Sequence, residues 1–146
     1  MQLRGPIFAL LAAFATPAVA SCDIGVSTPG ILAPTGTGAV LSSEAGIASV
    51  VAISNVTGIL NSTITISNPR LDSYPAGFAA GGATVEENYS ATWLLGSSAN
   101  PVFTAGPRSF VVPLGLLITI TLNNRVTASG GLKQGGYTTK TTIDCT

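Results

Sequence analysis

The stretch LLITITL at residues 116–122 decides the fold class, because every second side chain from Leu116 to Leu122 is aliphatic while Thr119 and Thr121 lie between them. Successive side chains of a β-strand point to opposite faces, so this stretch has one apolar face and one polar face. That pattern is typical of a strand with one buried and one solvated side in an antiparallel sheet. The same alternation occurs in STITIS at residues 62–67. We therefore predict that the aliphatic members are buried and that the threonines are largely exposed: Ile64, Ile66, Ile118, Ile120 and Leu122 on one side, and Thr65, Thr119 and Thr121 on the other.

Further short strands are predicted at residues 49–54, 83–95 and 109–112, and no stretch of useful length has the 3.6-residue period of a helix. Glycine and proline punctuate the chain between them, and each such signal is expected to reverse its direction. These signals are Thr28-Pro29-Gly30, Asn68-Pro69, Tyr74-Pro75-Ala76-Gly77, Gly81-Gly82, Asn100-Pro101, Gly106-Pro107 and Gly130-Gly131. Short strands at this spacing indicate an all-β, antiparallel β-sandwich, and residues 21–146 are expected to form one domain.

Residues 1–20 have the composition of a secretory signal peptide. Arg4 supplies the positive charge, an apolar run follows, and Ala18-Val19-Ala20 forms a small-residue cleavage site. We therefore expect export to the periplasm, the cell surface or the extracellular space, with no transmembrane segment in the mature chain. One alternative remains open at this point: Val19-Ala20-Ser21-Cys22 resembles a bacterial lipobox, in which Cys22 would be acylated and anchor the chain to a membrane.

The last strand is expected to run from Tyr137 to Cys145. Lys140 lies on one of its faces and should be exposed, whereas Ile143 and Cys145 share the other face and should point inward. The only other cysteine is Cys22, which opens the first strand. Two cysteines in an exported chain favour a disulfide between Cys22 and Cys145.

The composition argues against several function classes. The chain is 46% hydrophobic and 8% charged, and removing residues 1–20 leaves five Lys and Arg against six Asp and Glu. No basic patch is present to follow a phosphate backbone, so we expect no nucleic-acid binding. The sequence contains no histidine, which excludes the histidine-based nucleophilic systems and histidine-ligated metals. We expect no enzymatic activity, no cofactor and no metal site.

Few side chains remain as candidates for ligand binding. Glu86 and Glu87 are neighbours and would point to opposite faces of a strand, which argues against a catalytic carboxylate pair. The aromatic residues Tyr74, Phe78 and Trp93 are candidates for facing a glycan or another small ligand, although core packing is the commoner use of such rings. Three Asn-x-Ser/Thr sequons begin at Asn55, Asn61 and Asn88, and about two would arise by chance in a chain so rich in Ser and Thr.

The C-terminal third resembles the superfamily of spore coat protein U and the archaic chaperone–usher (Csu-type) fimbrial pilins. The matching segments are Val112-Pro113-Leu114-Gly115 and, after a Gly-rich stretch, Leu132-Lys133-Gln134-Gly135-Gly136-Tyr137, followed by a Thr-rich last strand. An early cysteine and Gly30-Ile31-Leu32 also fit the pattern. The resemblance covers the last 35 or so residues well and the rest loosely.

The resemblance implies an immunoglobulin-like sandwich that acts structurally, as a coat or pilus subunit, with other subunits or a periplasmic chaperone as partners. In the pilin branch a neighbouring chain adds a strand to an incomplete sheet. The corresponding edge here would be the last strand, with Tyr137, Thr139, Thr141 and Ile143 beside the added segment. Cleavage after Ala20 would leave no segment to donate, so this chain is expected only to receive a strand. The alternatives are a glycan- or ligand-binding module and the Cys22-anchored lipoprotein.

Overall fold

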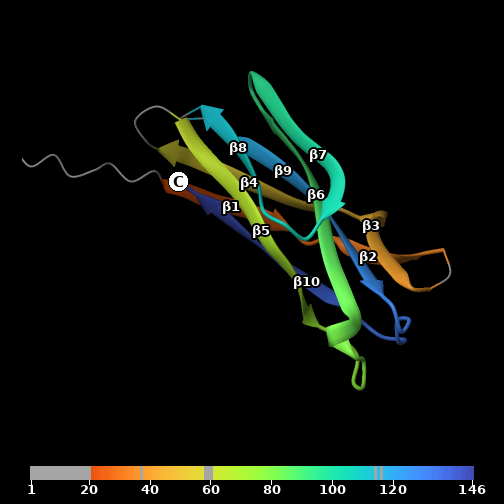
Figure 1. Ribbon diagram of the computed structural model, residues 1–146. Helices are drawn as coiled ribbons and strands as arrows, with labels where there is room; N and C mark the ends of the chain where they lie inside the picture. Colours follow the sequence, from red (N-terminus) through yellow and green to blue (C-terminus); the bar gives the residue numbers. More distant parts are fainter. Residues whose placement is uncertain (1–20, 37, 58–60, 114, 116) are drawn as a thin grey trace, which may run out of the picture.

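The computed structural model describes residues 21–36, 38–57, 61–113, 115 and 117–146, so the predicted signal peptide at residues 1–20, together with Leu114 and Leu116, lies outside the described residues. Over the described residues the chain forms ten strands and one turn of 3-10 helix (Figure 1). The strands are β1 (Ser21–Thr28), β2 (Ile31–Thr35), β3 (Val40–Ile47), β4 (Ser49–Thr57), β5 (Asn61–Ser73), β6 (Ala83–Trp93), β7 (Gly96–Thr104), β8 (Arg108–Pro113), β9 (Ile118–Ala128) and β10 (Thr138–Cys145), with the 3-10 turn η1 at Ala80–Gly82. No helix in this part of the chain is long and apolar enough to cross a membrane.

The strands form two antiparallel sheets. The larger sheet contains seven strands, in which β9 pairs with β6 on one side and with β4 and then β3 on the other. β1 and β2 extend this sheet beyond β4 and β3, and β7 extends it beyond β6. The smaller sheet has the order β10-β5-β8. The predicted all-β, antiparallel sandwich is confirmed.

The core lies between the two sheets, and its residues follow the predicted alternation. Along β9 every second side chain is fully buried while the intervening ones are half-buried. All five aliphatic residues of the two opening stretches are buried, as predicted: Ile64, Ile66, Ile118, Ile120 and Leu122. Ile143 is only half-buried, because it lies on an edge strand. Lys140 is exposed, as expected, with 59% of its side chain accessible.

The threonines were predicted to be largely exposed and are instead half-buried. Thr119 and Thr121 lie on β9, the central strand, where neighbours on β4 and β6 cover their flanks. Thr65 is covered on β5 by Ser109 of β8, and their hydroxyl oxygens lie 2.9 Å apart. A polar face in the middle of a sheet is thus screened by its own cross-strand neighbours.

Two predicted chain reversals are wrong. Asn68-Pro69 lies inside β5, and Asn100-Pro101 lies inside β7. The strand register shifts at both places. In the β5–β10 pair, Lys140 pairs with Arg70 but Thr142 pairs with Ser67, and the β6–β7 pair has a similar shift at residues 100–104 of β7. Asn68 has a φ of 55°. Proline without a backbone donor and a residue with positive φ are both tolerated at a bulge, so these signals mark irregular strands.

The predicted reversal at Thr28-Pro29-Gly30 is also wrong, because β1 and β2 continue past it to pair in turn with β4 and β3. The backbone N–H of Gly30 donates to the Ser49 hydroxyl at 3.0 Å across this break. A Cβ added to Gly46 would collide with the carbonyl oxygen of Ile31, so the backbones of β2 and β3 approach closely here. Glycine permits that approach.

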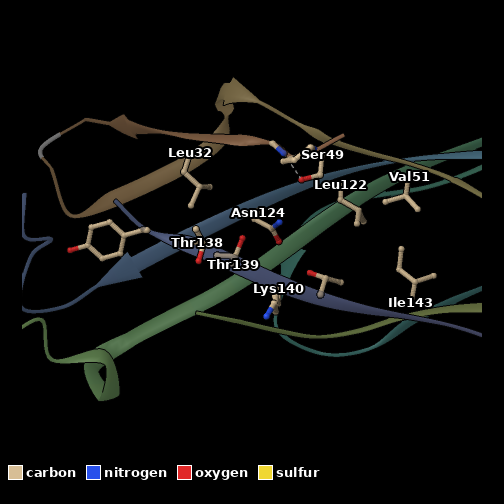
Figure 2. A pocket seen from close by; sticks show the side chains of 13 residues that line it. Leu32, Ser49, Val51, Leu122, Asn124, Thr138, Thr139, Lys140 and Ile143 are labelled. Carbon is tan, nitrogen blue, oxygen red and sulfur yellow. Dashed lines mark hydrogen bonds between the residues drawn. The ribbon is translucent and has the colours of Figure 1, made fainter. Parts of the chain in front are cut away.

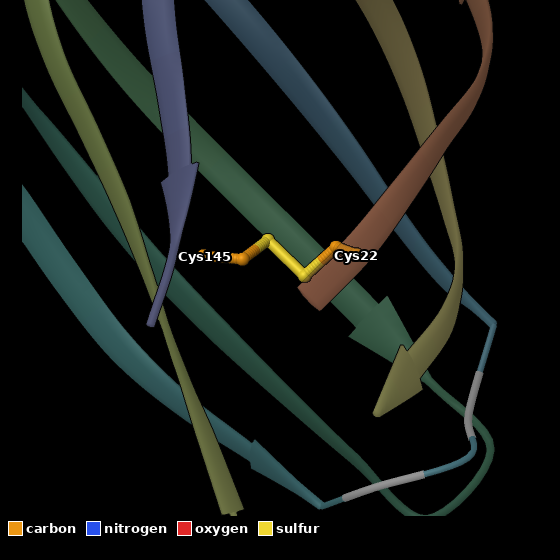
Figure 3. The surroundings of a disulfide bond; sticks show 2 residues. All are labelled: Cys22 and Cys145. Atoms are coloured by element: carbon orange, nitrogen blue, oxygen red, sulfur yellow. A yellow bond between two sulfur atoms is a disulfide. The ribbon is translucent and has the colours of Figure 1, made fainter. Parts of the chain in front are cut away.

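The disulfide between Cys22 and Cys145 is confirmed, with Cα atoms 6.1 Å apart. It joins β1 of the larger sheet to β10 of the smaller one, at the end of the sandwich where β10 finishes (Figure 3). Both cysteines are half-buried against the core. The bond engages the Cys22 sulfur that an acyl anchor would need, so an intact disulfide and a Cys22-anchored lipoprotein exclude each other.

Candidate functional site

The candidate site is the free edge of β10. Among the strands that the structure describes, β10 pairs with β5 alone. In an antiparallel ladder alternate residues direct their backbone N–H and C=O groups to opposite sides, so half of these groups on β10 face away from β5. An edge of this kind is a template for another strand.

A groove runs beside this edge. A hollow of about 340 Å³ lies between β10 and the inner face of the larger sheet, with Ser49, Val51 and Leu122 on one side and β10 on the other (Figure 2). A second hollow of about 340 Å³ shares Gly30, Leu32 and Tyr137 with the first. Together they follow the β10 side of the molecule from Gly135 to Ile143.

The four residues predicted to lie beside an added strand all line this groove: Tyr137, Thr139, Thr141 and Ile143. The Tyr137 ring packs edge-on against Phe78, with centroids 5.2 Å apart, and its hydroxyl donates to the Lys133 carbonyl at 3.0 Å. This aromatic contact fixes one end of the groove. At the other end the disulfide joins β10 to β1.

The floor of the groove is polar at its centre. Asn124 is on the inward face of β9, 7% exposed, and its Oδ1 has no hydrogen-bond partner among the described residues. Figure 2 shows Asn124 in the middle of the hollow, between Leu122 and Thr139. Its backbone N–H donates to the Ser43 hydroxyl at 2.9 Å. This bond takes the place of a backbone–backbone bond at the point along β9 where its partner changes from β3 to β4.

Glu87 lies directly across from Asn124 in the β6–β9 pairing. Its side chain is 1% exposed; Oε2 accepts a hydrogen bond from the Thr141 hydroxyl at 2.7 Å, and Oε1 has no partner in the described part of the chain. Burial raises the pKa of Glu87 above its ordinary value of 4.5, while the Thr141 hydrogen bond and the positive charge of Arg108 lower it in part. Two buried acceptor oxygens therefore lie behind the β10 edge.

Glu86 and Glu87 point to opposite faces, as expected for neighbours on a strand. Glu86 is on the outer face, where its Oε2 lies 2.7 Å from Nη2 of Arg125, and the Arg125 guanidinium also lies over the ring of Phe103. The two carboxylates do not share a site. Asn88, the start of a sequon, is 6% exposed and donates to Glu44 at 2.9 Å, so its amide is already engaged.

The candidate ligand-facing aromatics do not gather in one place. Tyr74 is 46% exposed and packs edge-on against the buried Phe78, near the start of β6. Trp93 ends β6 and stacks on Phe110, with centroids 6.2 Å apart. The Tyr74–Phe78 pair therefore lies near the start of β6, beside Ala83 and Val85, whereas Trp93 lies at the end of β6 (Figure 1). Beside Trp93, the turn residues Leu94 and Leu95 are more than 80% exposed.

No protein family, characterised protein or solved structure matches this chain. Its function is therefore inferred from its own geometry. Sequence reasoning missed Asn124 and the burial of Glu87. The alternation of side chains could have identified both. The residues two places before and after each of them point inward and are aliphatic or aromatic: Leu122 and Val126 around Asn124, and Val85 and Tyr89 around Glu87.

Proposed function

We propose that this chain is a secreted, non-catalytic structural domain of the spore-coat-U or fimbrial type, which assembles by accepting an extended segment of another chain along the free edge of β10. The observation that carries the proposal is the coincidence of an unpartnered edge with a groove on its open side. Backbone groups of β10 supply affinity, and the side chains along the groove select the incoming residues.

Among the described edge strands, β10 is well suited to this role. The other described edges are β1, β2, β7 and β8. The last three each contain a proline (Pro34, Pro101 and Pro113), whereas β1 contains none but is joined to β10 by the disulfide. Proline removes a backbone donor and is one of the devices that protect sheet edges from further pairing. β10, with the sequence TTKTTIDC, contains none, and its Lys140 is neutralised by Asp72 at 2.8 Å.

The disulfide limits the length of the added segment. A strand added to the free edge of β10 lies about 4.8 Å from β10, in the space that the disulfide crosses at Cys145. The Cα atoms of Cys22 and Cys145 are only 6.1 Å apart, so the segment must end before the bond. It therefore spans the stretch from Tyr137, just before β10, to Ile143, which matches about seven residues at roughly 3.3 Å each.

Titration of the purified full chain with synthetic peptides tests the proposal. Peptides of five to eleven residues that alternate Val and Thr should bind with an affinity that rises to about seven residues and then levels off. N-methylation of alternate backbone nitrogens should abolish binding in at least one of the two registers, because it removes ladder donors without changing the side chains.

A matched pair of variants tests whether peptides bind in this groove. Ile143→Lys puts a charge into the groove and should abolish peptide binding, whereas Val111→Lys makes the same change on an exposed position of β8 and should leave it intact. Circular dichroism confirms that both variants are folded. Failure of every peptide to bind, or binding that survives N-methylation in both registers, contradicts strand acceptance.

A further inference from the structure

Asn124 gives the groove a chemical preference that a purely apolar strand does not satisfy. We propose, building on the strand-accepting role, that the segment this groove takes carries a neutral amide side chain, glutamine or asparagine, at the position facing Asn124. The rest of its inward face is apolar, to match Val51, Leu122 and Ile143.

Leaving Asn124 covered without a hydrogen-bond donor would destabilise the complex. Its Oδ1 is already shielded from solvent and has no partner among the described residues. A strand laid over the groove would close the remaining access to this side chain, and a buried acceptor without a donor is destabilising. An incoming amide N–H supplies the missing donor, and an incoming Val or Leu does not.

A neutral amide suits this position better than a cation. The groove is lined by aliphatic and hydroxyl side chains and, among the described residues, by no carboxylate, so an ammonium or guanidinium would lose hydration there without gaining a counter-charge. Glu87 does not reverse this preference, because its Oε2 is bonded to Thr141 and its carboxyl lies behind that residue, away from the groove lining.

The test uses seven-residue peptides with valine at every inward position, and a series in which one inward valine at a time is replaced by glutamine, lysine or leucine. Binding to the purified full chain is measured by calorimetry. One glutamine position should bind about tenfold more tightly than the all-valine peptide, the effect expected of one buried acceptor gaining its donor. The lysine peptide at that position should bind more weakly than the glutamine peptide.

Asn124→Leu should reverse the order, so that the all-valine peptide binds about tenfold more tightly than any glutamine peptide. Asn61→Leu, the same change on an exposed residue at the start of β5, should keep the native order. If the all-valine peptide binds native protein as tightly as every glutamine peptide, or if Asn124→Leu leaves the order unchanged, the amide preference is wrong while strand acceptance stands. If no peptide binds at all, strand acceptance itself is overturned and the preference with it.

Discussion

Removal of the Cys22–Cys145 bond should be the most destabilising single covalent change in this domain. The two cysteines are 123 residues apart in sequence, so the bond closes almost the whole folded chain into one loop. In the chain-entropy model a loop of this length restricts the unfolded state by about 5 kcal/mol at 25 °C. The total stability of a domain this size is about 5–15 kcal/mol, so Cys22→Ala/Cys145→Ala should be close to its folding threshold.

Urea denaturation followed by tryptophan fluorescence measures this loss. The single variants Cys22→Ala and Cys145→Ala, measured with a reductant, should each lose nearly as much as the double variant, because either change removes the bond. The urea dependence of the free energy should steepen as the unfolded chain expands. If the double variant is unfolded without denaturant, refolding with a stabilising osmolyte gives its free energy. A loss of less than about 1 kcal/mol would refute the reasoning.

Two further predictions concern the core and its buried acid. Ile120→Ala should lower the free energy of unfolding by about 2–5 kcal/mol, since Ile120 is fully buried between the sheets, whereas Leu94→Ala, at an 81% exposed turn residue, should change it by less than about 0.5 kcal/mol in the same urea assay. Because burial raises the pKa of Glu87, the folded chain binds its proton more tightly than the unfolded chain, and stability should fall as pH rises from 4.5 toward the folded-state pKa. Glu87→Gln should flatten that fall in urea titrations between pH 4 and 7, and Glu86→Gln on the outer face should not; equal slopes for all three proteins would contradict the assignment.

Much of this fold follows from side-chain alternation. The period of two in residues 62–67 and 116–122 placed five aliphatic side chains in the core and three threonines on the opposite face, because a strand has only two faces and water distinguishes them strongly. The disulfide followed from cysteine count and compartment. The alternation is a rule about neighbouring residues, and the disulfide follows from a property of the whole chain. Neither inference requires knowledge of which strands pair.

The incorrect predictions concern segments whose structure depends on the strand they pair with. Asn68-Pro69 and Asn100-Pro101 have the composition of turns, yet the chain continues through both because the partner strand tolerates a slip in register. Strands β2, β3 and β7 were not predicted, because their sequences do not alternate cleanly between apolar and polar residues. They form strands because β2 pairs with β3, β3 with β9 and β7 with β6. Propensity for a sheet depends on such cross-strand contacts more than on the segment itself.

Glu87 and Asn124, the buried polar residues behind the β10 edge, are the exceptions that give this sandwich a site. A chain selected only for stability would place apolar side chains at the inward positions of β6 and β9, as it does on either side of Glu87 and Asn124. The two exceptions occupy opposed positions in one strand pair, and each has an acceptor oxygen without a hydrogen-bond partner among the described residues. Thr141 ties one of them to the free strand β10. Buried polar groups without partners are rare in native proteins, and places where a sequence departs from its own pattern are where function is most often found. Their convergence beneath the β10 edge is therefore what favours a ligand with a donor at this point over a uniformly apolar strand.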